Sequence, residues 1–331
     1  MTQQRQPPGA PSPMRHRRLV IAVTVLLLAL LVWRSRAWEA GPLLAAADAS
    51  GLLAALALDL ALIALWGLRS RLLLAAAGHR LGWLELSLLG VFANLANAVT
   101  PASTGEALRA LLLRDRFGIP LPTGLAVILI ERFYALALII LAAAAAVTIT
   151  LGSLVGTGAL LAWLAALVLA TLPALVYRTP LRLARVLTAL RLDDHRRPAT
   201  VRRLARGLIE AEETMAGLLR RPPVVAGFLA TTFPTLAVFT AQLWLVLAAL
   251  GAPVSFTAAW AAMGAGMLAG ILSALPFGLG AADVVGAGIL IGIGADATVA
   301  GTAFLLLRVI GTLPLGLAGG AASLLLTRPR R

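Results

Sequence analysis

Long apolar runs dominate the chain, and charged residues gather in short clusters between them. About 20 apolar residues are needed to span the hydrocarbon core, so runs of this kind are typical of membrane-crossing helices. Six runs are expected to cross. They cover residues 19–32, 43–66, 119–150, 154–177, 224–250 and 296–326. The pattern predicts an all-α polytopic membrane protein.

Two further apolar segments, residues 83–113 and 255–293, are each interrupted by proline and glycine. The interruptions contain Pro101, Gly105, Pro276, Gly278 and Gly280. The second limbs, 106–113 and 281–293, are too short to span. Irregular backbone at membrane depth is tolerated only where protein or a wet cavity surrounds it. Both segments are therefore predicted to be re-entrant helical hairpins.

The first run is short and follows a basic start, which leaves two interpretations open. Either a retained span or a cleaved signal peptide fits residues 19–32. We favour a retained span, because Trp33 and Trp38 are typical of an interfacial edge. Residues 1–14, rich in proline and glutamine, are expected to be disordered.

The two interrupted segments carry the same order of residues about 175 positions apart. In each, a proline precedes a glycine by four residues, and that glycine precedes an arginine, Arg132 or Arg308, by 27 or 28. The two hairpins are expected to enter from opposite faces, as an inverted repeat of the kind found in transporters. A single membrane domain, 15–327, would then hold repeat 1 at about 83–177 and repeat 2 at about 224–327.

Charge follows the expected topology. The net charge is +14, and its arginines concentrate before the first run, in the segment 178–222 and in the tail 328–331. Basic residues are enriched in the cytoplasmic loops of membrane proteins. Both termini are therefore expected in the cytoplasm of a protein of the inner membrane. Arg69 and Arg71 are likewise predicted to lie beyond the cytoplasmic end of the second span. The basicity then indicates contact with anionic lipid headgroups, not with nucleic acid.

Within the arginine-rich segment, apolar residues recur at helical spacing. They are Val201, Leu204, Leu208, Met215 and Leu218. An amphipathic helix on the inner membrane surface and a solvated linker helix both fit this pattern.

Six charged residues lie at membrane depth close to the breaks: Glu106, Arg109, Glu131, Arg132, Asp283 and Arg308. Charge there is costly, which indicates a polar cavity or ion pairs. Glu106 and Arg109 share a helix face and can pair, whereas the adjacent Glu131 and Arg132 need partners from the neighbouring hairpin. The arginines either bind an anionic headgroup or only lock helices together. Glu106 could also cap its own half-helix.

Other polar residues carry weaker signals. Asp48 is expected near the outer end of the second run, whereas Asp59 lies deeper and must face protein or water. Asn94 and Asn97 either line a cavity or bond between helices. The cluster around Asp193 is expected to be solvated, and with no cysteine in the chain we expect neither a metal site nor a cofactor.

The segment Thr104-Gly105-Glu106-Ala107-Leu108-Arg109, followed by Ile130-Glu131-Arg132, Pro276-Phe277-Gly278-Leu279-Gly280 and Asp283, resembles the lysylphosphatidylglycerol synthase transmembrane region. That family is also described as flippase-like membrane proteins. The resemblance covers about residues 15–327. It implies movement of aminoacylated phospholipid between leaflets. Asp283 stands where a glutamate is expected, which shortens the reach of its carboxylate.

The expected function is a flippase-like transporter of an anionic or aminoacylated phospholipid, or of another lipid-linked headgroup. Arg109, Arg132 and Arg308 would hold the headgroup, with the three carboxylates balancing them or taking a cationic group or a proton. The chain leaves no room for a synthase domain, so no enzyme activity is expected and a separately encoded lipid-modifying enzyme is a candidate partner. The alternative is a membrane-embedded glycosyl- or aminoacyl-transferase, and a third is an accessory protein.

Overall fold

A computed structural model describes four stretches of the chain and a few isolated positions outside them. The stretches are residues 37–99, 104–141, 198–273 and 278–327. Their regular structure is entirely helical, without a strand. Four helices in them are long and apolar enough to cross a membrane: α3 (Ala49–Ala76), Leu121–Leu141, α9 (Pro222–Ala249) and the part Ala297–Gly319 of α12 (Ala297–Thr327). These confirm the predicted helical membrane protein and four of its six spans. The predicted span 154–177 and most of 19–32 lie outside the described residues.

Four shorter helices match the limbs of the two interrupted segments. They are α4 (Trp83–Val99), α5 (Thr104–Phe117), α10 (Phe256–Leu272) and α11 (Ala281–Gly292). Within each pair the two helices pack against each other. Gly278 and Gly280 have positive φ angles of 63° and 82°, which confirms that the second interruption is not helical. Pro101 and Pro276 lie outside the described residues.

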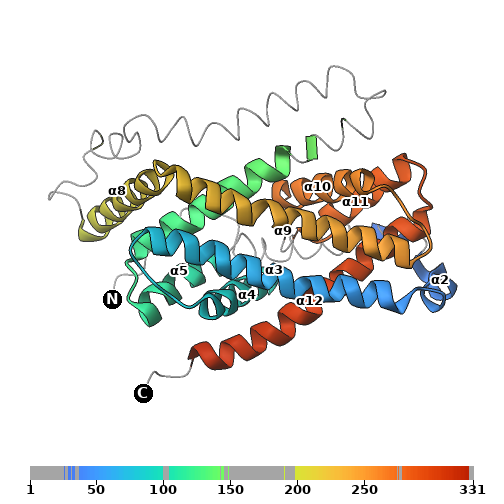
Figure 1. Cartoon of the computed structure of the whole chain (residues 1–331), viewed down its shortest axis with the longest axis horizontal. Helices are drawn as coiled ribbons and strands as arrows, with labels where there is room; N and C mark the ends of the chain where they lie inside the picture. Colours follow the sequence, from blue (N-terminus) through green and yellow to red (C-terminus); the bar gives the residue numbers. More distant parts are fainter. Residues whose placement is uncertain are drawn as a thin grey trace, which may run out of the picture.

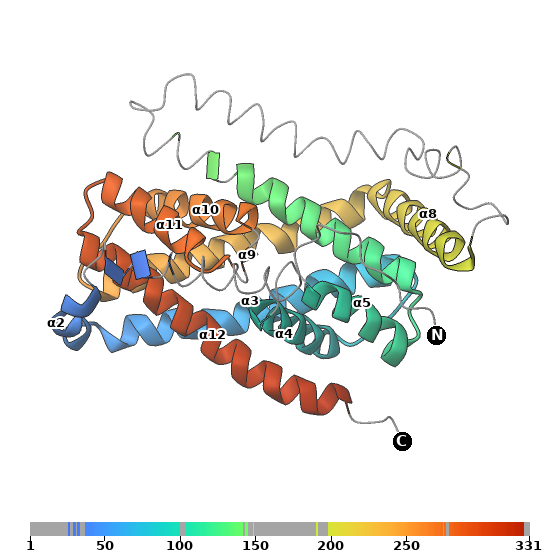
Figure 2. The same ribbon diagram turned by 180° about the vertical axis from the view of Figure 1, so that it is seen from behind.

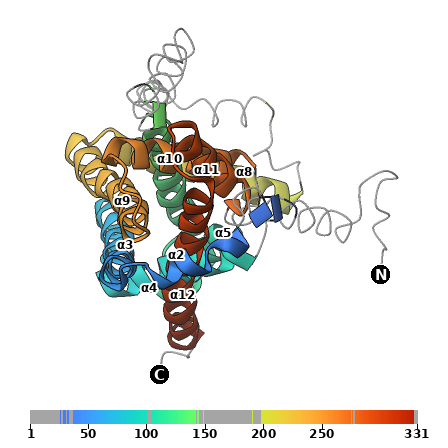
Figure 3. The ribbon, with the colours of Figure 1, turned by 90° about the vertical axis from the view of Figure 1, so that its right-hand side faces the viewer.

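The two helix pairs sit at opposite ends of the molecule. Figures 1 and 2 show α4 and α5 at one end and α10 and α11 at the other, with α3 and α9 running between the ends. The helices α3 and α9 contact each other along their length and both touch α12. Viewed along the long axis, α3 and α9 stand on one side of α12 (Figure 3).

Three further elements are described. A 3-10 turn (Ala37–Glu39) and the short helix α2 (Gly41–Ala45) precede α3, and α8 (Ala199–Leu219) precedes α9. On α8, Met215 and Leu218 are buried as the predicted apolar stripe requires, whereas Val201 and Leu204 are exposed. The stripe therefore packs on the protein only toward the end of the helix.

The helix α3 differs from the predicted span 43–66 at both ends. It begins after Asp48, whose carboxylate accepts hydrogen bonds from the backbone N–H groups of Ser50 (3.0 Å) and Gly51 (3.1 Å), a typical N-cap. Asp48 is thus at the end of the helix, as predicted. At the other end nothing stops the helix before Gly78, which adopts a φ of 92°. Arg69 consequently lies inside the helix, which corrects its predicted place beyond the span.

Gly105 is the second residue of α5, so its predicted role as part of the interruption is wrong. It serves close packing instead: a Cβ atom there would lie 2.0 Å from the Ala93 carbonyl oxygen and 2.7 Å from Asn97 Oδ1. Its own N–H donates to Asn97 Oδ1 at 2.8 Å. Small residues let membrane helices approach in this way.

Replacing Gly105 by alanine should therefore destabilise the protein by about 1–3 kcal/mol, the usual cost of overpacking a tight contact. Denaturant titration in detergent micelles, followed by tryptophan fluorescence, measures this loss. The matched control is Gly217→Ala on α8, where no atom lies within 4 Å of the added methyl group. The control should be neutral or stabilising, because alanine favours helix over glycine by up to about 1 kcal/mol. Equal behaviour of the two variants would contradict the close contact.

Candidate functional site

A cavity of about 630 Å³ lies between the two helix pairs and is lined by residues from α3, α4, α5, α9, α10, α11, α12 and Leu121–Leu141. All six charged residues predicted at membrane depth line it: Glu106, Arg109, Glu131, Arg132, Asp283 and Arg308. The charged residues of both predicted repeats therefore line the same cavity.

The most buried contact of the site joins Arg109 and Glu131, which are 5% and 3% exposed. Arg109 binds the carboxylate with both terminal nitrogens, Nη1 at 2.6 Å from Oε2 and Nη2 at 3.1 Å from Oε1. Ser70 of α3 donates to Glu131 Oε1 at 2.7 Å and accepts a hydrogen bond from Arg109. This bidentate geometry is the strong form of the arginine–carboxylate pair. It holds α3, α5 and Leu121–Leu141 together.

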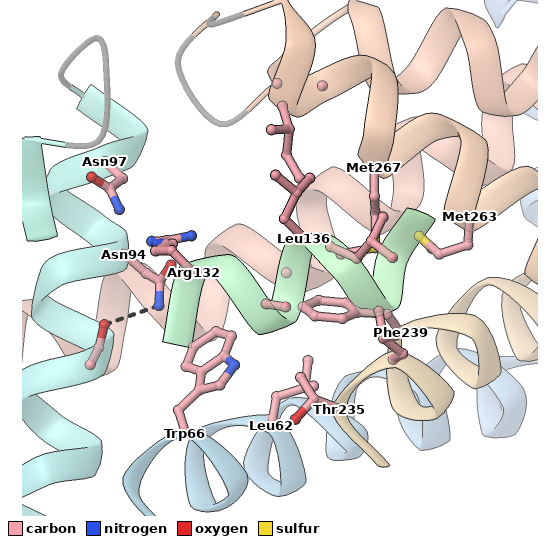
Figure 4. Close-up of a pocket in the computed structure, with 18 of the residues that line it drawn as sticks. Leu62, Trp66, Asn94, Asn97, Arg132, Leu136, Thr235, Phe239, Met263 and Met267 are labelled. Carbon is pink, nitrogen blue, oxygen red and sulfur yellow. Dashed lines mark hydrogen bonds between the residues drawn. The ribbon is translucent and has the colours of Figure 1, made fainter. Parts of the chain in front are cut away.

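A second carboxylate, Glu106, receives two arginines. Arg132 donates to its Oε1, and Arg109 Nη1 lies 3.5 Å from its Oε2. Glu131 and Arg132 therefore find their partners on α5, as predicted from their adjacent positions. The Gly105 N–H near the start of α5 donates to Asn97, and the residues that precede α5 lie outside the described part of the chain, so the alternative that Glu106 caps its own helix stays a prediction. Figure 4 shows Arg132 beside Asn94 and Asn97 at one end of the cavity.

The third carboxylate, Asp283, pairs with Arg308 at 2.8 Å from its Nε. Its other oxygen accepts the Gly280 N–H at 2.9 Å, which caps α11. This pair has the same register as Glu106 with Arg132. The carboxylates are the third residues of α5 and α11, and the arginines are the twelfth residues of Leu121–Leu141 and α12. The two ion pairs therefore join equivalent positions of their helices.

Arg69 is a site residue that the sequence analysis missed, because its position beside Arg71 was taken for a cytoplasmic cluster. It lines the cavity from α3, lies over the Phe228 ring at 5.9 Å, and interacts electrostatically with Glu131 and Glu106. Its Nε is buried without a hydrogen-bond partner in the part of the chain that the structure describes. The sequence could have indicated Arg69 only if the helix had been predicted to continue past residue 66, because α3 runs to Ala76.

The remaining wall of the cavity is largely apolar. Leu62, Leu136, Phe239, Met263 and Met267 line it. In Figure 4 these side chains lie toward the end away from Asn94, Asn97 and Arg132. The cavity is consequently amphipathic, with charged side chains beside a largely apolar wall.

No metal centre accompanies this arrangement: across the described ranges, no group of three histidine, aspartate or glutamate side chains could hold an ion. The residues around Asp193 lie outside those ranges. The site instead offers arginine donors and carboxylates, which suit ionic recognition of a headgroup.

Long apolar helices around an amphipathic cavity define a multi-pass membrane protein with an internal polar site. A family model described as the lysylphosphatidylglycerol synthase TM region matches residues 18–319, and the chain belongs to that family. The resemblance seen in the sequence is thereby confirmed. A search of curated proteins gave no match.

Proposed function

We propose that the protein is a flippase-like transporter that moves an anionic phospholipid between the leaflets of the inner membrane. The observation that carries this proposal is the amphipathic cavity, which has room for a polar headgroup beside apolar side chains that suit acyl chains. Arginine guanidinium groups bind phosphate oxygens well because their donors match that geometry. The headgroup would occupy the end near Arg132 and Arg69.

Charge supports an anionic headgroup at this end. Three guanidinium groups, those of Arg69, Arg109 and Arg132, face only two carboxylates, those of Glu106 and Glu131. One positive charge is therefore in excess, and in a low-dielectric cavity an uncompensated charge attracts a counter-ion strongly. A phosphodiester supplies that charge. An aminoacylated lipid would in addition place its cationic group near the carboxylates.

The arrangement of the helix pairs supports alternating access. We infer that α4–α5 and α10–α11 are re-entrant hairpins that enter from opposite faces, because they occupy opposite ends of the molecule (Figure 1) and carry equivalent ion pairs. Repeats of this kind expose a central site to each side in turn. With cytoplasmic termini, the α4–α5 pair stands at the cytoplasmic face, where the arginine-rich segment would meet anionic lipids.

Reconstitution into vesicles tests the proposal. Fluorescent phosphatidylglycerol in the outer leaflet should become inaccessible to a membrane-impermeant reductant faster in vesicles that contain the protein. Recovery of an unchanged lipid supports transport. Recovery of a chemically modified lipid would instead favour the membrane-embedded transferase, and empty-vesicle rates would refute both.

Replacing Arg69 by glutamine should lower the rate for phosphatidylglycerol about tenfold or more. A hydrogen bond to a charged group contributes about 1.5–3 kcal/mol, and the substitution removes the charge excess as well. The matched control is Arg71→Gln, which alters an exposed arginine two residues along the same helix and outside the cavity wall. The control should keep the wild-type rate. Equal rates for the two variants would show that Arg69 does not bind the headgroup.

A further inference from the structure

Asp59 is a buried acidic side chain of the cavity wall that the proposed headgroup site does not use. It is 6% exposed and lies about 15 Å along α3 from the start of the helix, well inside the apolar layer. Its Oδ2 is buried and, within the described ranges, has no hydrogen-bond partner. The other three carboxylates of the cavity wall each pair with an arginine.

Gln242 of α9 holds the other oxygen of this carboxyl group. Its Nε2 donates to Asp59 Oδ1 at 3.0 Å and to the Ala55 carbonyl oxygen at 3.1 Å. A carbonyl oxygen can only accept, so the contact with Ala55 fixes which end of the amide points toward Asp59. Asp59 Oδ1 is therefore an acceptor, and Oδ2 is the position at which a proton can reside.

Within the part of the chain that the structure describes, the elements packed on α3 bring no cation to Asp59. Between its first and last residues α9 carries no charged side chain, α4 carries only Glu85 and α12 only Arg308, which is held by Asp283. On Leu121–Leu141, Glu131 and Arg132 are engaged by α5. An ionised carboxylate without a cationic partner is costly at this depth, and protonation removes that cost. A single carboxyl group facing an amide N–H offers too few oxygens for a metal ion.

Protonation of Asp59 changes the charge of the whole cavity wall. The described residues of that wall carry four cations, Arg69, Arg109, Arg132 and Arg308, and four carboxylates, Asp59, Glu106, Glu131 and Asp283. With Asp59 ionised the wall is neutral; with a proton on Oδ2 it has one excess positive charge. A singly charged anion is therefore bound best when Asp59 is protonated, and by linkage the bound anion strengthens proton binding by the same factor.

We propose that Asp59 is a proton-binding site and that the protein moves one proton together with each singly charged anionic phospholipid. This proposal rests on the proposed function. The proton enters from the cavity, binds Asp59 Oδ2 while Gln242 keeps Oδ1, and leaves as the cavity opens to the other side and the headgroup departs. Asp59 and Arg69 are ten residues apart and both line the cavity from α3. Any movement of α3 therefore carries the proton-binding carboxyl group and the guanidinium group of Arg69 together.

The experiment uses vesicles containing the purified full chain, a trace of fluorescent phosphatidylglycerol and an imposed pH difference. Coupling to one proton drives the lipid toward the leaflet on the alkaline side. The equilibrium ratio between leaflets should shift up to about tenfold per unit of pH difference, since one unit corresponds to a tenfold change in an equilibrium constant. Dissipating the gradient with a protonophore should return the ratio to its starting value.

Asp59→Asn keeps an acceptor for Gln242 but cannot titrate, so lipid should still move while the leaflet ratio no longer responds to the gradient. The matched control is Asp48→Asn, at the exposed start of the same helix. Hydrogen bonds from Ser50 and Gly51 hold the pKa of Asp48 below its usual range, and asparagine is an equally good N-cap. This control should respond to the gradient as the wild type does.

Three outcomes would overturn the proposal. In the first, the leaflet ratio of the lipid in wild-type vesicles does not change with the pH difference; in the second, the ratio for Asp59→Asn still changes with it. In the third, the wild-type ratio responds to a sodium gradient at equal pH and not to the pH difference. Infrared spectroscopy gives a readout that needs no transport. Wild-type protein labelled with ¹³C in its aspartate carboxyl groups should show the C=O band of a protonated aspartate at neutral pH, lost in Asp59→Asn. If the wild type moves no lipid, the proposed function and the coupling fail, while this band still decides whether Asp59 binds a proton.

Discussion

Replacing Arg109 by leucine should destabilise the protein by about 3–5 kcal/mol, the usual cost of breaking a buried ion pair by removing one partner. The substitution leaves the carboxylate of Glu131, 3% exposed, without its bidentate partner. It also removes a donor to the Ser70 hydroxyl group, which is buried in the same contact. Denaturant titration in detergent micelles measures the effect.

The double variant Arg109→Leu with Glu131→Leu separates loss of the pair from loss of packing. An apolar replacement of a complete buried pair is often close to neutral, so the double variant should recover at least half of the stability lost in the single variant. Wild-type stability of Arg109→Leu alone would contradict a structural role for this pair, and would leave Arg109 free to act on the headgroup.

Arg132→Leu is expected to have the opposite signature, with transport lost and the fold kept, because the side chain of Arg132 is 52% exposed and an exposed ion pair contributes less to stability than a buried one. Arg308→Leu should lose stability as well as transport, because the side chain of its partner Asp283 is 1% exposed and would be left unpaired. Each variant should lower phosphatidylglycerol translocation at least about tenfold, equivalent to about 1.4 kcal/mol. Abundance of Arg132→Leu in the membrane should stay near that of the wild type.

The control for these two substitutions is Arg114→Leu. Arg114 pairs with Asp115 at 2.6 Å and its side chain is 49% exposed, at the far end of α5 from the cavity residues. It should keep both abundance and transport. Should Arg132→Leu and Arg308→Leu both fail to accumulate in the membrane, these arginines only lock helices together, and the headgroup contact belongs elsewhere.

Much of the site could be predicted because charge is rare in this chain. In an apolar helix a single arginine such as Arg132 stands out, and the adjacency of Glu131 and Arg132 was enough to predict partners on the neighbouring hairpin. The start of α4 was predicted at the residue, since the interrupted apolar segment begins at Trp83. The all-helical membrane fold follows from run length alone.

Other features could not be predicted, for physical reasons that differ between residues. Arg69 was misplaced because two arginines near the end of an apolar run look the same whether the helix stops or continues to Gly78. Gly105 was assigned to a turn, since sequence does not separate a glycine needed for positive φ from one needed for close packing. Asp59 was recognised as deep, but its amide partner Gln242 is 183 residues away in the chain.

The unequal ion pairs of the two halves have a consequence for the resting state. Among the described residues, the carboxylates of Glu106 and Glu131 engage two arginines around α5 through three ion pairs, and one described ion pair, that of Asp283 with Arg308, joins α11 to α12. In a carrier with two gates, the gate closed by more ion pairs is the harder to open. We therefore expect the empty protein to rest with its cavity open on the α10–α11 side. A lipid that binds there must supply the free energy that breaks the ion pairs around α5.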